Sequence, residues 1–379
     1  MIPRLQIQPY YEEEDDQDDL LKITRTRSGY DLKEAVRAID MHMGQTGADA
    51  TGKLLHYTAD LIASGGKDLW GRLCYEHAID HIGLASPRIF HYLRNRFAQL
   101  DKDAALQTTE AFYGSLTVQK IVGEAALVMQ LCPRRPKLKI PIIDTKTHRD
   151  DAWLRSVLRS PDSNAVRRVY QASVDARQMY HAANEIVGAI NGGELERALF
   201  WAKWLFEEDA MVRKEFKGPG LSTLDRGPPG GKGKNNVGFF LVACIGETYR
   251  ELAGKGLIAM HEEFQTLLDL YRTADTRLTA RRRTELLFLM CQILTEVPRW
   301  KVPRAPPLVK DPAVLLRIVE QVPLFFKEVM VYPALTKLLP KTVSKAKPKK
   351  LKTGGDGSNT MDKDAAYEAA FNQFMNRTY

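Results

Sequence analysis

Two clusters in the sequence contain residue types that could perform chemistry. His77 and His81 are one helical turn apart, with Glu76 and Asp80 beside them, and this spacing could place two metal ligands on one helix face. The order differs from the His-Glu-x-x-His motif of zinc proteases, and the sequence offers no evident third ligand. We interpret them as a surface pair of histidines and predict no metal site.

A glycine-rich stretch, residues 227–234, superficially resembles a phosphate-binding loop. Such a loop ends in Gly-Lys-Ser/Thr and follows a buried strand, and neither feature is present here. We interpret the stretch as a basic loop whose Lys232 and Lys234 could touch phosphates. The sequence also has no serine-nucleophile motif, no paired carboxylate motif and no Cys/His couple, so we predict a protein that is not an enzyme and has no cofactor.

Basic residues form the more informative pattern. The net charge of +8 suggests an anionic partner, either nucleic acid or an acidic protein. Arginines and lysines alternate with prolines before Pro141 and again before Pro303, and three arginines begin the helix that precedes the second of these segments. Cations at a helix N-terminus are unfavourable by roughly 0.3–1 kcal/mol each, which again suggests an anion. The predicted nucleic-acid-binding residues are Arg134, Arg135, Lys137, Lys139, Arg281, Arg282, Arg283, Arg299, Lys301, Lys345, Lys347, Lys349, Lys350 and Lys352.

Helix-forming residues dominate between the glycine and proline breaks, and alternation of period two is nearly absent, so we predict an all-α fold. Asp31 is the expected N-cap of the first helix, and Gly65 and Gly66 end the second. The later helices are expected at residues 68–82, 89–97, 104–112, 118–131, 152–158, 164–178, 180–190, 194–207, 237–252, 260–271, 280–296 and 312–322.

The chain is expected to contain two related helical-bundle modules in tandem. Both end in an apolar helix and a proline-rich basic segment, and Cys74 and Cys244 occupy matching places on their central helices. The predicted parts are an acidic disordered arm (1–28), module 1 (29–141), a helical bridge (142–178), module 2 (179–303), C-terminal helices (304–340), a basic Gly/Ser linker (341–360) and an aromatic helix (361–379).

The aromatic helix would carry Tyr367, Phe371 and Phe374 on one face. It is interpreted either as a docking peptide for a protein partner or as a segment that folds back onto its own chain. The sequence has no signal peptide and no membrane-spanning run, so we expect an intracellular protein, nuclear or cytoplasmic, or one packaged in a virion.

The first module resembles the C-terminal helical collar of replication-associated AAA+ ATPases of the RarA/MgsA type, which is related to the clamp-loader collar. The resemblance covers about residues 28–140. It lies in Tyr30-Asp31-Leu32, Ala63-Ser64-Gly65-Gly66-Lys67-Asp68, Asp80-His81-Ile82-Gly83-Leu84-Ala85-Ser86-Pro87 and Leu131-Cys132-Pro133. The ATPase module of that family is absent, so the resemblance implies a collar without a motor that self-associates or joins another assembly.

Together these features predict a non-catalytic helical scaffold that acts in DNA replication, DNA repair or nucleoprotein assembly. It would oligomerise through its collar-like modules and contact nucleic acid through the basic segments. The alternative is a structural or adaptor protein, for example of a viral particle, whose basic segments bind acidic proteins.

Overall fold

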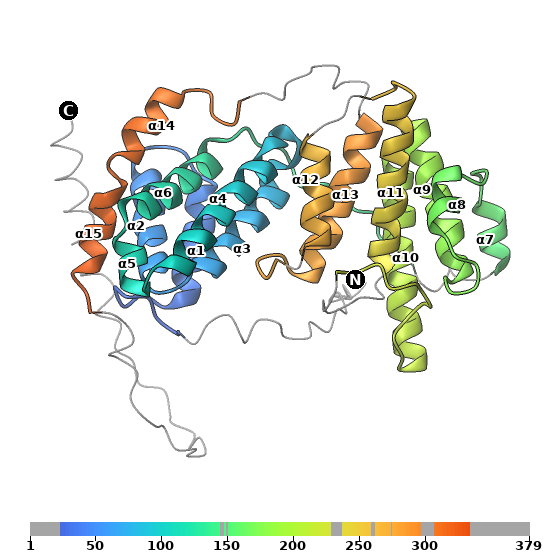
Figure 1. The fold of residues 1–379 in the computed structure, drawn as a ribbon, viewed down its shortest axis with the longest axis horizontal. Coiled ribbons are helices and arrows are strands. Elements are labelled where there is room, and N and C mark those ends of the chain that lie inside the picture. The colour runs from blue at the N-terminus through green and yellow to red at the C-terminus, as the bar shows by residue number, and fades with distance from the viewer. Residues whose placement is uncertain are drawn as a thin grey trace, which may run out of the picture. The chain divides into compact units, whose positions relative to one another are not determined.

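The computed structural model describes residues 23–144, 148, 151–228, 237–258, 262–273, 275–296 and 307–333. These residues form an all-α fold, which confirms the predicted fold class (Figure 1). Within these ranges no helix is long and apolar enough to cross a membrane. The helical elements are α1 (Leu32–Met43), α2 (Ala48–Ala63), α3 (Lys67–His77), η1 (Ala78–Ile82), η2 (Gly83–Ala85), α4 (Arg88–Leu106), α5 (Thr109–Gly114), α6 (Leu116–Leu131), α7 (Asp151–Val157), α8 (Asn164–Val169), α9 (Arg177–Gly192), α10 (Leu195–Phe216), α11 (Val237–Gly254), α12 (Glu262–Arg272), α13 (Ala280–Glu296), α14 (Pro312–Val319) and α15 (Val322–Met330).

The described residues form two compact units, each assembled from segments that are distant in the sequence. The large unit contains residues 71–101 and 132–310, and the small unit contains residues 23–70, 102–131 and 311–333, within the described ranges. This division assigns all of predicted module 2 (179–303) to the large unit and divides predicted module 1 (29–141) between the two units.

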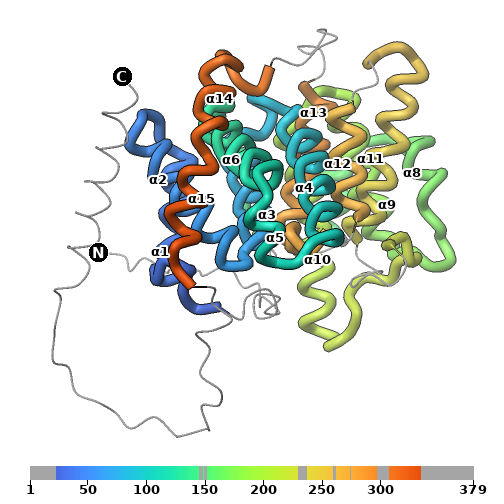
Figure 2. Tube along the Cα trace, turned by 60° about the vertical axis from the view of Figure 1, so that its left-hand side comes forward, coloured from blue at the N-terminus to red at the C-terminus, as the bar shows by residue number. Residues whose placement is uncertain are grey.

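The small unit is built around α2. Helices α1, α6 and α15 all pack against it (Figures 1 and 2). Asp31 caps α1 as predicted, since its side chain accepts hydrogen bonds from the backbone N–H groups of Lys33 and Glu34. Helices α6 and α15 approach closely because Gly123 of α6 has no side chain at the place where Val322 of α15 lies.

Arg27 joins the beginning and the end of the small unit. Its Nε donates a hydrogen bond to the carbonyl oxygen of Tyr332 at 2.7 Å, and its backbone N–H donates to Ser64 Oγ at 2.7 Å. Thr26 and Arg27 are buried although the sequence placed them in a disordered arm ending at residue 28. The ordered fold therefore begins earlier than predicted, because polar residues of this turn find partners on α2 and after α15.

In the large unit, helices α9, α10, α11 and α13 pack against one another (Figure 2). A buried ion pair fixes two of the segments beside them: Arg226 Nη2 lies 2.5 Å from Asp175 Oδ2 and also donates to the carbonyl oxygen of Val169 at 2.8 Å. This clamp explains why α8 ends at Val169 whereas the sequence predicted a helix to residue 178. Residues 170–176 turn toward Arg226 instead of continuing the helix.

A second feature of the large unit is a polar seam between α4 and α12. Arg88 pairs with Glu263 at 3.3 Å, His91 contacts Thr266 at 3.3 Å, and Arg94 pairs with Asp269 at 2.8 Å. In each of these three contacts, the residue on α12 lies 175 positions after its partner on α4. Moving along α4 therefore moves the contact in the same direction along α12. The two helices therefore run parallel and in register along this seam.

Candidate nucleic-acid interface

The candidate interface begins where the predicted third helix changes its geometry. Residues 68–82 were predicted as one α-helix, but α3 ends at His77 and continues as a π-helical turn, η1. Gly83 then takes a φ of +49°, in the left-handed region that favours glycine. Turns of this kind inside α-helices are rare and are frequent at functional sites.

The extended segment after α6 docks on this turn. The backbone N–H of Arg135 donates to the carbonyl oxygen of His81 at 2.9 Å. The side chain of Arg135 passes over Gly83, where a Cβ atom would lie 3.4 Å from its Cδ. The proline-rich basic segment is thus held in an extended conformation against the end of η1, as the sequence pattern of alternating prolines and cations predicted.

Asp80 of η1 joins this segment to the N-terminus of α13. Its Oδ1 accepts from Lys137 Nζ at 2.7 Å and from Arg282 Nη1 at 2.9 Å. Glu285 lies beside both cations, 2.7 Å from Arg282 and 3.5 Å from Lys137. Glu76 completes the group at 3.5 Å from Arg282. We call these five residues the Asp80 cluster.

Electrostatics hold this cluster in its charged form. Burial on its own raises the pKa of Asp80, but the hydrogen bonds from Lys137 and Arg282 outweigh burial, and the pKa is lowered below its ordinary value of 3.8. Burial also disfavours the Arg282 cation, yet Glu285 and Asp80 raise the pKa of its guanidinium above its ordinary value. Asp80 therefore stays ionised at neutral pH and keeps both cations in place.

The structure corrects the argument drawn from the arginines at the start of α13. Arg282 has intramolecular carboxylate partners, and Arg283 Nη2 donates to the carbonyl oxygen of Asp275 at 3.4 Å. The unfavourable helix-end position of these two residues is offset within the chain, so it requires no external anion. The sequence did not reveal Asp80 as a partner because it is distant from Arg282 along the chain. Glu285, three residues after Arg282, was a signal that could have been used.

Several predicted cations face solvent around the cluster. Arg134, Lys137, Lys139 and Arg281 are exposed, and Arg135 is partly exposed. Lys137 and Arg282 contact the carboxylates of Glu76, Asp80 and Glu285, and Arg135 packs on Gly83 close to them in the chain. The structure thus brings together the predicted segments 134–139 and 281–283, which contain seven basic residues.

The remaining predicted site residues lie outside the described residues. They are Arg299, Lys301, Lys345, Lys347, Lys349, Lys350, Lys352, Tyr367, Phe371 and Phe374, together with most of the glycine-rich stretch 227–234.

The histidine pair differs from its prediction as a surface pair. His77 is 1% exposed, and its ring centroid lies 4.6 Å from that of His81, which is exposed. His77 is the last residue of α3 and His81 lies in η1, so the two histidines belong to different helical segments.

Comparisons with protein-family models, with curated proteins and with solved structures find no match for this chain. The resemblance to the RarA/MgsA collar therefore stays a prediction from the sequence.

Proposed function

We propose that this chain is a non-catalytic helical scaffold that binds nucleic acid through the basic surface around the Asp80 cluster. The observation that carries the proposal is the convergence of segments 134–139 and 281–283 on the single carboxylate of Asp80. Lysine and arginine on an extended segment suit phosphate contact, which is independent of base sequence. A role inside the cell in DNA replication, DNA repair or nucleoprotein assembly is the form of this function that agrees with the collar resemblance.

The proposal includes an internal repeat and self-association through the helical modules. The seam between α4 and α12 supports the repeat, because Phe90-His91-Tyr92-Leu93 of α4 is similar in sequence to Phe264-Gln265-Thr266-Leu267 of α12. These are the helices that lie parallel and in register. If α4 and α12 are equivalent helices of two repeats, a pseudo-two-fold axis parallel to both would place them side by side in the same direction, as observed. Superposition of module 1 (29–141) on module 2 (179–303) tests the repeat, and light scattering of the purified chain tests self-association.

Nucleic-acid binding is tested by fluorescence anisotropy with labelled DNA and RNA at about 50 mM and about 200 mM salt. The proposal predicts binding at the lower salt concentration that weakens steeply at the higher one, since each phosphate contact releases counterions. Absence of binding at low salt, or an affinity that salt does not change, contradicts it.

An adaptor or structural protein, for example of a viral particle, is the second candidate. Exposed apolar side chains on the small unit favour it, because a protein partner could cover them. They include Leu106, Leu116, Leu316, Leu324 and Val331, all between 47% and 81% exposed. In this case an acidic protein would occupy the basic surface, and the anisotropy titration would show no nucleic-acid binding at either salt concentration.

A further inference from the structure

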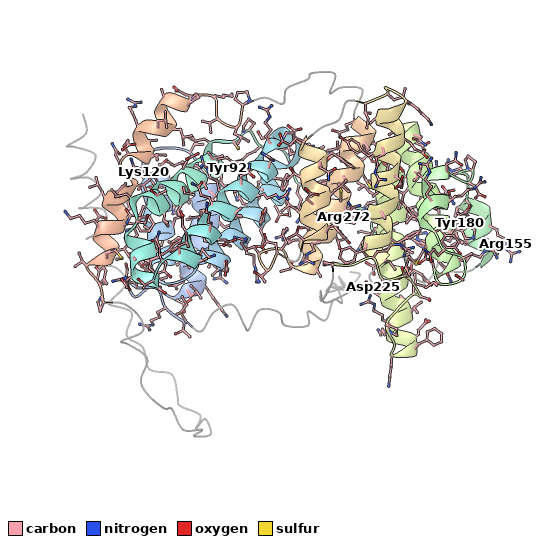
Figure 3. The ribbon with its side chains drawn as sticks, viewed as in Figure 1. Tyr92, Lys120, Arg155, Tyr180, Asp225 and Arg272 are labelled. Carbon is pink, nitrogen blue, oxygen red and sulfur yellow. The ribbon has the colours of Figure 1, made fainter. Side chains whose placement is uncertain are left out.

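A groove in the large unit lies along the seam of α4 and α12. Its volume is about 450 Å³, within the range of small-molecule sites. Tyr92, labelled in Figure 3, is one of the α4 residues that line it. The lining residues are Arg88, His91, Tyr92, Asn95, Arg96, Gln99, Glu262, Glu263 and Leu308.

One face of α4 supplies the chemistry of this groove. Arg88, Tyr92, Asn95, Arg96 and Gln99 recur at spacings of three and four residues and so share a helix face. They offer an aromatic ring, two side-chain amides and two guanidinium groups. A nucleotide presents the matching groups: a flat base for the ring, donors and acceptors on the base edge for the amides, and a phosphate for a guanidinium.

Arg96 and Tyr92 already form a stacked pair. The Arg96 guanidinium carbon lies 5.2 Å from the centroid of the Tyr92 ring, and Arg96 Nη1 donates to Gln99 Oε1 at 3.3 Å. A guanidinium plane and a tyrosine ring both stack on bases, so the pair forms a platform on which a base can lie.

The two α12 carboxylates that line the groove contact residues near the start of α4. Glu263 pairs with Arg88 at 3.3 Å, and Glu262 lies 3.3 Å from His91 Nε2. Asn95 Nδ2 also lies 2.8 Å from His91 Nε2, which fixes the imidazole between the two helices. Arg88 thus compensates the charge of Glu263 at the start of the groove, and Arg96, two turns further along α4, gives the far end a positive charge.

The groove and the basic surface lie in the same unit. Helix α4 starts five residues after Gly83, on which Arg135 packs. With a rise of about 1.5 Å per residue, Tyr92 lies roughly 6 Å along the helix from Arg88. For a strand whose phosphates contact Arg135 to place a base at Tyr92, that base must be free to leave its neighbours. Bases inside a duplex are stacked on each other and cannot do so, whereas bases of a single strand can.

We infer that the groove between α4 and α12 holds a base of a single-stranded nucleic acid, stacked at Tyr92 beside Arg96. This inference rests on the proposed function and names its substrate class. The groove adds preference for single strands to a basic surface that on its own binds any nucleic acid.

The test compares a single-stranded oligonucleotide with its duplex by anisotropy, for the wild-type chain and for Tyr92→Ala. We expect the substitution to weaken single-strand binding by about tenfold and to leave duplex binding unchanged. Tyr92→Phe keeps the ring and should bind as the wild type does, which separates lost stacking from lost folding. Tyr180→Ala, a partly buried tyrosine on α9 that Figure 3 also labels, is the matched control and should leave both affinities unchanged.

A direct measurement accompanies the titration. An oligonucleotide with 5-iodouracil is irradiated in complex with the full chain, and the crosslinked residue is identified by mass spectrometry. A crosslink at Tyr92 supports the inference. Equal loss of single-strand and duplex binding in Tyr92→Ala, no loss in either, or a crosslink elsewhere overturns it while the proposed function stands. No binding of any nucleic acid overturns both.

Discussion

Lys137 Nζ and Arg282 Nη1 bind the same oxygen of Asp80, at 2.7 and 2.9 Å. One carboxylate on the π-helical turn thus fixes the extended basic segment and the N-terminus of α13 relative to each other. The surface that we propose for nucleic acid depends on this arrangement, because the cations would otherwise belong to two separate segments.

Asp80→Asn tests this dependence. The neutral side chain no longer compensates Lys137 and Arg282, so the large unit should lose about 1–3 kcal/mol in free energy of unfolding. Nucleic-acid affinity should fall, because Asp80 no longer holds the two basic segments together. Urea denaturation and anisotropy measure the two effects. Asp162→Asn, an equal charge change at an exposed position of the same unit, is the control and should change neither. A more stable Asp80→Asn protein contradicts the role given to this carboxylate.

Acid should weaken the same cluster. The folded-state pKa of Asp80 is below its ordinary value, so the unfolded chain binds more protons as the pH falls. The stabilising contribution is therefore fully present above the unfolded-state pKa and is lost as the pH falls through the folded-state pKa. The difference in unfolding free energy between the wild type and Asp80→Asn should shrink on acidification below about pH 4. If this difference in unfolding free energy grew on acidification, the result would contradict the stabilising role of ionised Asp80.

His56 predicts a pH dependence of the small unit at milder pH. Burial lowers its pKa from 6.5 to about 4, so the folded state favours the neutral ring. The contribution of the neutral His56 ring to the free energy of unfolding is fully present above pH 6.5, and it is lost as the pH falls toward 4. The small unit should be about 2 kcal/mol less stable at pH 5 than at pH 7.5 on account of this residue.

Urea denaturation of the wild type and of His56→Phe at both pH values measures this loss. The phenylalanine variant should lose less stability on acidification, with a remainder from His42, whose pKa burial also lowers. An identical loss in both proteins would show that His56 does not titrate as described.

Gly123 tests the packing of α6 against α15. A Cβ atom there would lie 2.6 Å from Val322 Cγ1 and 2.9 Å from Val322 Cβ, and Val322 is buried. Gly123→Ala should therefore destabilise the small unit by about 1–3 kcal/mol, although alanine favours helix more than glycine does. Adding Val322→Ala removes the clashing methyl groups, so the double variant should be more stable than the sum of the two single effects implies.

Gly114→Ala is the control for this prediction. Nothing lies within 4 Å of a Cβ atom at Gly114, so the change should be neutral or slightly stabilising. Thermal melts and urea titrations of the four variants provide the measurement. Strict additivity of the single variants would contradict a direct contact between the two helices.

Helix ends that depend on local chemistry were predictable from the sequence. Asp31 caps α1, Gly193 ends α9 with a φ of +70°, and α13 spans Ala280–Glu296 as predicted. Ends that depend on distant residues were not. Helix α8 stops where Asp175 meets Arg226, and α10 runs to Phe216, beyond the predicted residue 207.

The same distinction holds for the candidate site. The positions of Arg135 and Arg282 are evident from their segments, but their convergence is not, because Asp80 and Arg282 are joined only in the folded chain. The α4 groove was missed for another reason. The spacing of Arg88, Tyr92 and Arg96 on one helix face was available as a signal, but its second wall, α12, comes from the other half of the sequence.

The most direct test of the central claim is the salt dependence of nucleic-acid binding in Lys139→Glu/Arg281→Glu, which reverses two exposed cations of the proposed surface. The account predicts at least about tenfold weaker binding at about 50 mM salt, and a slope of log affinity against log salt that is shallower by about two. Arg155→Glu/Lys255→Glu reverses two exposed cations elsewhere in the large unit and should behave as the wild type. Equal losses in the two double variants, or an unchanged slope in the first, would contradict the assignment of this surface to nucleic acid.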